Sequence, residues 1–125
     1  MIERVKENYN FSKRDERLLS NLTPIMEDAA DGFVDAFYKK VMQFKNASKY
    51  LKDEKIIERH RGAMREWFLK LFQDPYDDDY LHYLEDIGYT HVKAKLPPHY
   101  VNVCISFVRN GTQHTFRMDR RFFFM

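Results

Sequence analysis

The sequence has little of what marks a secreted, membrane-bound or nucleic-acid-binding protein. Cys104 is the only cysteine, so no disulfide can form within the chain, and a reducing compartment fits. The charged N-terminus has no apolar run behind it, and no segment is apolar over the length that spans a membrane. Because 21 Lys and Arg stand against 19 Asp and Glu, the net charge of +2 does not favour nucleic acid or anionic lipid as a partner. We therefore expect a cytoplasmic protein.

Glycine and proline are also scarce, with four of each, whereas 11 Phe and 8 Tyr are many for a chain of 125 residues. That length is typical of one domain, and the sequence shows no repeat, low-complexity tract or linker. An aromatic-rich helical chain builds a thick core, or it lines a pocket for a flat aromatic ligand.

Apolar residues recur at steps of three and four along most of the chain, which predicts an all-α fold with no strand. Thr23 before Pro24 predicts a capped helix start, and Asp53 predicts another. We expect a loose arm or short helix over 1–11 and a short connecting helix over 46–51. Another short helix is expected over 12–22. Longer helices are expected over 23–44 and 53–73, from the acidic run 77–79 to the double proline 97–98, and from there onward.

Three polar side chains are the candidates for a site. His91 shares a predicted helix face with Ile87 just before the double proline, where an oriented imidazole would suit a metal or heme. His60 lies on the apolar face of another helix, and Tyr38 lies beside the apolar stripe of a third. The alternatives are that His91 is a hydrogen-bonded core residue, that Tyr38 is a core or half-exposed aromatic, and that His60 faces solvent.

The order of several short segments resembles the globin domain of globin-coupled sensors, a group that includes protoglobins, aerotaxis transducers and heme-regulated diguanylate cyclases. The resemblance spans about 12–115, and its most specific part is Ile-Gly-x-x-His-x-x-x-x-Leu-Pro-Pro-x-Tyr, from Ile87 to Tyr100. The segments Phe37-Tyr38 and Ala63-Met64-Arg65-Glu66-Trp67 support it.

This resemblance implies a globin-like fold that binds heme b, with His91 as the proximal iron ligand and Tyr38 as the hydrogen-bond donor to bound oxygen. His60 would lie beside the bound gas or act as a sixth iron ligand when gas is absent. Met64 and Trp67 are interpreted as pocket wall, because methionine at helical spacing is usually packing. Ile87 and Tyr100, from the matching segments, complete the predicted cofactor-binding set.

The C-terminal part departs from the family pattern, which continues through another long helix. Here only a remnant over 112–125 remains, so we expect a truncated chain that lacks most of the final helix, with Gly111 bending or ending the helix before it. The last helices of such domains usually form the dimer interface. A homodimer is therefore expected, formed by Val101, Cys104, Phe107, Val108 and the apolar end Phe122, Phe123 and Phe124.

The function expected from these observations is a heme-based oxygen sensor domain that passes its state to a partner chain or to an output domain outside this sequence. It would bind diatomic gases and would not itself be an enzyme. One alternative is a globin-like interaction domain without heme. The other is a stand-alone protoglobin-like heme protein that handles nitric oxide or peroxide, because peroxide cleavage needs polar groups beside the iron.

Overall fold

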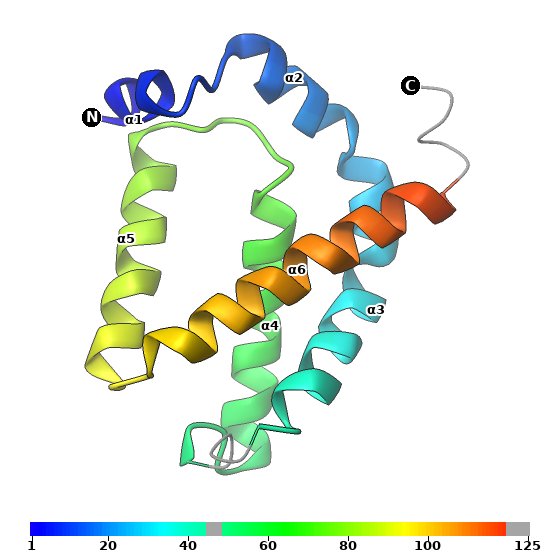
Figure 1. Ribbon diagram of the computed structural model, residues 1–125, viewed down its shortest axis with the longest axis vertical. Helices are drawn as coiled ribbons and strands as arrows, with labels where there is room; N and C mark the ends of the chain where they lie inside the picture. Colours follow the sequence, from blue (N-terminus) through cyan, green and yellow to red (C-terminus); the bar gives the residue numbers. More distant parts are fainter. Residues whose placement is uncertain (45–48, 120–125) are drawn as a thin grey trace.

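The computed structural model describes residues 1–44 and 49–119, and these form helices joined by turns and short loops, with no strand among them (Figure 1). The all-α prediction is confirmed. The helices are α1 (Ile2–Asn8), α2 (Lys13–Asn21), α3 (Thr23–Val41), α4 (Glu54–Lys70), α5 (Asp78–Lys93) and α6 (Pro98–Met118). The predicted connecting helix over 46–51 lies mostly outside the described residues. No described helix is both long enough and apolar enough to cross a membrane.

Side-chain caps mark the start of α2, α4 and α5. The Asp53 carboxylate accepts from the Ile56 N–H at 2.9 Å, as predicted, and Asp77 caps α5 in the same way. The prediction for Thr23 is wrong. Helix α3 begins after Leu22, which has helical backbone angles, and the Thr23 hydroxyl donates instead to the Phe72 carbonyl. Because α2 runs almost directly into α3, no extended residue is present there to act as a cap.

Helix α3 is the centre of the core and packs against α2, α4 and α6. The rings of Phe33 on α3 and Phe68 on α4 stack with centroids 4.1 Å apart. Two clusters of buried side chains lie along this helix. The first comprises Ile25, Met26, Ala30, Phe68 and Phe72. The second comprises Val34, Phe37, Tyr38 and Leu51.

The N-terminal arm is held in place rather than loose. The Lys6 ammonium lies 2.6 Å from a carboxylate oxygen of Glu16 on α2, and both side chains are nearly buried. The main-chain N–H of Ile2 donates to Asp78 at the start of α5, at 2.8 Å. Helix α1 therefore links the beginning of α2 to the beginning of α5.

The predicted dimer stripe on α6 faces the core of its own chain. Helix α6 crosses α3 (Figure 1), so that Val108 is buried and the Phe107 ring lies 6.2 Å from that of Phe37. Cys104 packs against the second buried cluster. The exposed apolar residues of α6 are instead Val103, Ile105 and Met118. The apolar end Phe122 to Phe124 lies outside the described residues.

Gly111 does not end α6, and residues 112–118 do not begin a further helix. The helix runs without interruption to Met118. A side-chain carbon added at Gly111 would meet the Phe33 ring at 3.8 Å, an ordinary packing distance. The glycine therefore lies where α6 passes over α3, and its neighbours keep it helical.

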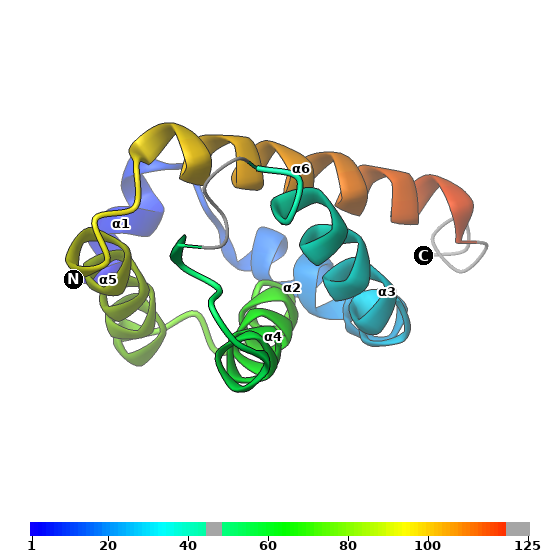
Figure 2. The same ribbon diagram turned by 90° about the horizontal axis from the view of Figure 1, so that it is seen from below.

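None of the residues of helix α5 is buried, which is otherwise true only of the short helix α1 among the described helices. Helix α5 lies to one side of α4 and is joined to α6 by the turn at Pro97 (Figures 1 and 2). One face nevertheless carries side chains that are only half-exposed, namely Tyr80, Leu84, Ile87 and His91. Because an apolar helix face is stable when it is covered, this face is the natural boundary of a ligand site.

Candidate functional site

The site begins with a contact between α3 and α4. Tyr38 is buried, with 5% of its surface exposed, and its hydroxyl is hydrogen-bonded to Nδ1 of His60. The two rings meet edge to face with their centroids 5.6 Å apart. The structure thus joins two residues that are 22 positions apart in the sequence and that belong to different predicted helices.

The surroundings of Tyr38 keep its hydroxyl protonated. Burial raises the pKa of Tyr38 to about 12, and the positive charge of Arg61 opposes this shift. The Arg61 guanidinium lies 5.1 Å from the centroid of the Tyr38 ring and forms an ion pair with Asp35. This cation–π contact holds the ring from the side of α4.

His60 is neutral at physiological pH for a related reason. Its pKa is lowered from the ordinary value, first by burial and second by the charge of His91. A substantial part of the His60 surface stays accessible, although enough protein surrounds the ring to disfavour its charged form. A neutral imidazole has one N–H, so the bond runs either from the Tyr38 hydroxyl to Nδ1, with the imidazole proton on Nε2, or from Nδ1–H to the hydroxyl oxygen.

His91 lies in the last turn of α5, half-buried, with Ile87 one turn before it. In the described part of the chain its ring makes no hydrogen bond, so both ring nitrogens are available. The charge of His91 also lowers the pKa of His60, as the second cause after burial. That the two imidazoles line one cavity stays a prediction.

These residues fit a heme group. A single neutral imidazole supplies one strong bond to iron, which suits an ion that a macrocycle already holds on its other sides. The faces of α4 and α5 beside the histidines carry the apolar side chains Met64, Leu84 and Ile87, all half-exposed. A flat aromatic cofactor would cover such surfaces, while the polar groups His91 and His60 would lie toward its metal.

Comparison with known proteins decides the family. The family model for protoglobin matches residues 1–121. This chain belongs to the protoglobin family. Its fold is also similar to the globin domain of a Geobacter sulfurreducens globin-coupled sensor, with a TM-score of 0.87 and 30% sequence identity. That similarity covers 95% of this chain and 80% of the other. No curated protein sequence matches this chain.

Membership in the protoglobin family confirms the resemblance and the globin-like fold, and it implies a heme-binding globin domain for diatomic gases. Of the remaining predicted residues, only Met64 packs against the buried cluster that contains Tyr38. Trp67 packs against the other cluster, and Tyr100, at the start of α6, stacks on Phe44 with centroids 5.7 Å apart.

Arg61 is the residue of this protoglobin site that the sequence pattern missed. It follows His60 directly, so its helical position predicts a solvent-facing side chain. The structure shows the long side chain reaching across to Tyr38 on α3 and to Asp35. Asp35, three positions before Tyr38, was a sequence signal that a basic residue could pair with this part of α3. Spacing within one helix does not show which arginine would do so.

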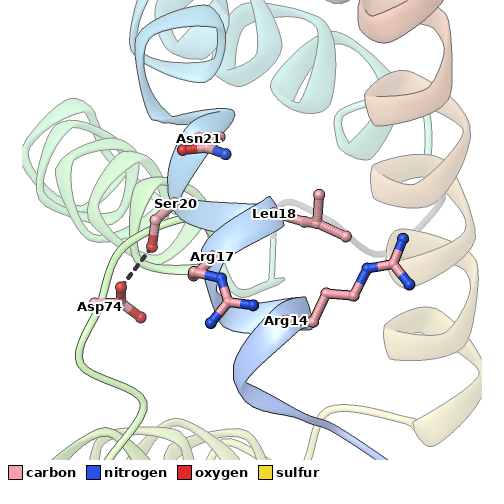
Figure 3. A pocket seen from close by; sticks show the side chains of 6 residues that line it. All are labelled: Arg14, Arg17, Leu18, Ser20, Asn21 and Asp74. Atoms are coloured by element: carbon pink, nitrogen blue, oxygen red, sulfur yellow. Dashed lines mark hydrogen bonds between the residues drawn. The ribbon is translucent and has the colours of Figure 1, made fainter. Parts of the chain in front are cut away.

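A separate hollow lies at the other end of the molecule, between α2 and the loop that precedes α5 (Figure 3). Within it, the Ser20 hydroxyl donates a hydrogen bond to the Asp74 carboxylate, at 2.8 Å. The hollow is lined by Arg14, Arg17, Leu18, Ser20, Asn21 and Asp74. None of the predicted site residues lines it.

Proposed function

We propose that this protoglobin-family chain is a heme-based oxygen sensor domain that binds heme b through His91. The observations that support the proposal are the hydrogen bond between Tyr38 and His60, the influence of the His91 charge on the pKa of His60, and the half-exposed apolar side chains on α4 and α5. Heme, when bound, supplies the iron atom that takes a diatomic gas. Holding the heme and surrounding the bound gas would be the task of this chain's own side chains.

His91 would supply the proximal nitrogen, and α5 would hold that ring in place. On the other side, the family resemblance assigns Tyr38 as donor to oxygen, and its protonated hydroxyl is suited to donation. His60 would lie beside the gas, or would ligate iron as a sixth ligand when gas is absent. Met64, Trp67, Ile87 and Tyr100 would form the wall around the cofactor.

The sensor signal would leave through α6. Helix α5 connects to α6 through Pro97, and α6 crosses the central helix α3. A shift of α5 would therefore displace α6. We propose a homodimer through the C-terminal part, with Val103 and Ile105 at the contact because these residues are exposed. The chain would work in the cytoplasm, without nucleic acid, and any enzymatic output would lie outside it.

A second function is favoured by the same pair of polar residues. Tyr38 and His60 form a hydrogen-bonded polar pair beside a buried apolar cluster, and such groups assist peroxide cleavage. A protein that detoxifies nitric oxide or peroxide would turn over these substrates faster than free heme does. A sensor would bind gas and show no such turnover.

The experiment is an absorption spectrum of protein purified with a heme supply, in ferric, ferrous and oxygen-exposed forms. His91→Ala should lose or alter the Soret band, whereas His82→Ala should leave it unchanged, because His82 is an exposed residue on the same helix. Unchanged ferric and ferrous spectra in His60→Leu would exclude His60 as sixth ligand. A colourless parent protein would reject the proposal in favour of a heme-free interaction domain.

A further inference from the structure

We infer that Tyr38 acts as a positioning residue for His60, and that the group offered to a gas molecule is the Nε2–H of His60 rather than the Tyr38 hydroxyl. This inference rests on the proposed function and deepens it, because it names the residue that determines gas affinity. It differs from the role that the family resemblance gives to Tyr38.

The first step is proton accounting at the hydrogen bond. A tyrosine hydroxyl has one proton, and a neutral imidazole has one N–H. When Tyr38 donates to Nδ1 of His60, that proton is committed and the imidazole proton must lie on Nε2. The hydroxyl cannot donate to a gas molecule at the same time without leaving His60.

The second step is the rigidity of Tyr38. Its ring belongs to the buried cluster of Val34, Phe37 and Leu51, and it meets the Phe37 ring edge to face with centroids 5.7 Å apart. Arg61 lies on the ring as well. Because close packing disfavours movement of a buried ring, the hydroxyl stays where it meets His60.

The third step concerns the other ring nitrogen of His60. In the described part of the chain, Nε2 of His60 has no hydrogen-bond partner, and part of the residue is accessible. Nε2–H is therefore a fixed donor without an acceptor, on the helix that bounds the proposed site.

Iron ligation by His60 would require the opposite arrangement. Nε2 would have to lose its proton to bind the metal, so the proton would lie on Nδ1. The Tyr38 hydroxyl oxygen would then accept a hydrogen bond from Nδ1–H. The hydrogen bond between the two residues would remain, with its direction reversed. Our inference describes the form in which His60 is not an iron ligand.

The first test reads the tautomer directly. Correlation spectra of the ¹⁵N-labelled histidine rings would be recorded at neutral pH, without heme and in the diamagnetic carbon monoxide-saturated form. We expect the His60 proton on Nε2 in the parent, with the Nδ1 signal displaced in Tyr38→Phe and unchanged in Tyr76→Phe. Tyr76 is the matched control because its buried hydroxyl donates elsewhere, to the Leu71 carbonyl. A proton on Nδ1 in the parent, or no change in Tyr38→Phe, would overturn the inference.

The second test is a double-mutant cycle on the oxygen off-rate. Tyr38→Phe and His60→Leu should each raise this rate roughly two- to tenfold, the range of one neutral hydrogen bond. The double variant should be no faster than the faster single variant, because both changes remove one unit. Multiplied effects would show that Tyr38 donates independently and would contradict the inference. Absence of a Soret band in the parent would instead reject the proposed function, and the spectra without heme would still test the tautomer.

Discussion

The main-chain N–H of Leu96 donates a hydrogen bond to the carbonyl oxygen of His91, at 3.1 Å. The N–H of Lys95 bonds to the Val92 carbonyl at 3.0 Å, so the end of α5 has the two bonds of a Schellman motif. Lys95 takes the left-handed position of this motif, with φ of 57°. The proposed iron ligand therefore belongs to the turn that this cap closes.

Replacing Lys95 with glycine should stabilise the protein. A residue with a side chain is strained at positive φ, and glycine relieves that strain while it adds freedom to the unfolded chain. We expect Lys95→Gly to raise the free energy of unfolding by about 0.5–1 kcal/mol. Lys93→Gly, in the last helical turn, should lower it by a similar amount. Urea unfolding of both variants measures the difference, and equal effects of the same sign would contradict the cap.

Heme should order α5 more than any other helix. Because α5 has no buried residue, the helix packs weakly in the absence of cofactor, and its amide protons are poorly protected from exchange with solvent. We expect the amides from Ile87 to His91 to exchange quickly in protein without heme and to be strongly protected after heme is added. The amides of Ala30 and Val34 on the buried side of α3 serve as the control, and they should change little. Equal protection of α3 and α5 before heme addition would show that α5 is already packed.

The ion pair that holds α1 should fail at alkaline pH. The pKa of Lys6 is raised above 10.5, chiefly by its hydrogen bond with Glu16, while burial opposes the shift. A folded-state pKa above the unfolded value gives a stabilisation that is complete below pH 10.5 and is lost as pH rises through the folded-state pKa.

Lys6→Met should therefore lose about 1 kcal/mol of stability at neutral pH, and parent and variant should converge at high pH. Chemical unfolding at a series of alkaline pH values measures this difference. Lys13→Met is the matched control, because the Lys13 side chain is 86% exposed and lies 3.7 Å from the same carboxylate. A difference between parent and Lys6→Met that did not vary with pH would indicate lost packing instead of lost charge.

Local signals were sufficient to predict most of the helices. Asp53 and Asp77 are each followed by a helical pattern, and both act as caps because the preceding backbone is extended. Thr23 carries the same signal and does not act as a cap, because α2 reaches it in a helical conformation. A residue can cap a helix only if the preceding helix ends before it. This depends on two helices together, so the sequence pattern of one helix does not predict it.

The site shows the same limit. Periodicity placed Tyr38, His60 and His91 on or beside apolar faces, and the family resemblance gave His91 and Tyr38 their roles. The hydrogen bond between Tyr38 and Nδ1 of His60 depends on the distance between α3 and α4, so no pattern within either helix predicted it. The contact of Arg61 with Tyr38 escaped prediction for the same reason.

The two sides of α6 offer a final test, because they should respond differently to substitution. Phe107 packs between Phe33 and Phe37, whereas 45% of the Ile105 surface is exposed. Phe107→Ala should lower the free energy of unfolding by about 2–3 kcal/mol, since it leaves a cavity beside aromatic rings. Ile105→Ser should change it by less than about 0.5 kcal/mol, as is usual for surface substitutions. Denaturant unfolding of dilute protein measures both values.

Association should follow the opposite order. If α6 forms the proposed homodimer, Ile105→Ser weakens it because an apolar contact is replaced by a hydroxyl, and Phe107→Ala leaves it unchanged in the folded fraction. Sedimentation velocity over a range of concentrations separates the two effects. The opposite result would be a dimer that dissociates in Phe107→Ala and persists in Ile105→Ser. It would mean that the Phe107 side of α6 contacts a partner chain instead of its own core. A parent protein that stays monomeric throughout would remove the homodimer from the proposal and leave the contacts between α6 and α3 as the route of the signal.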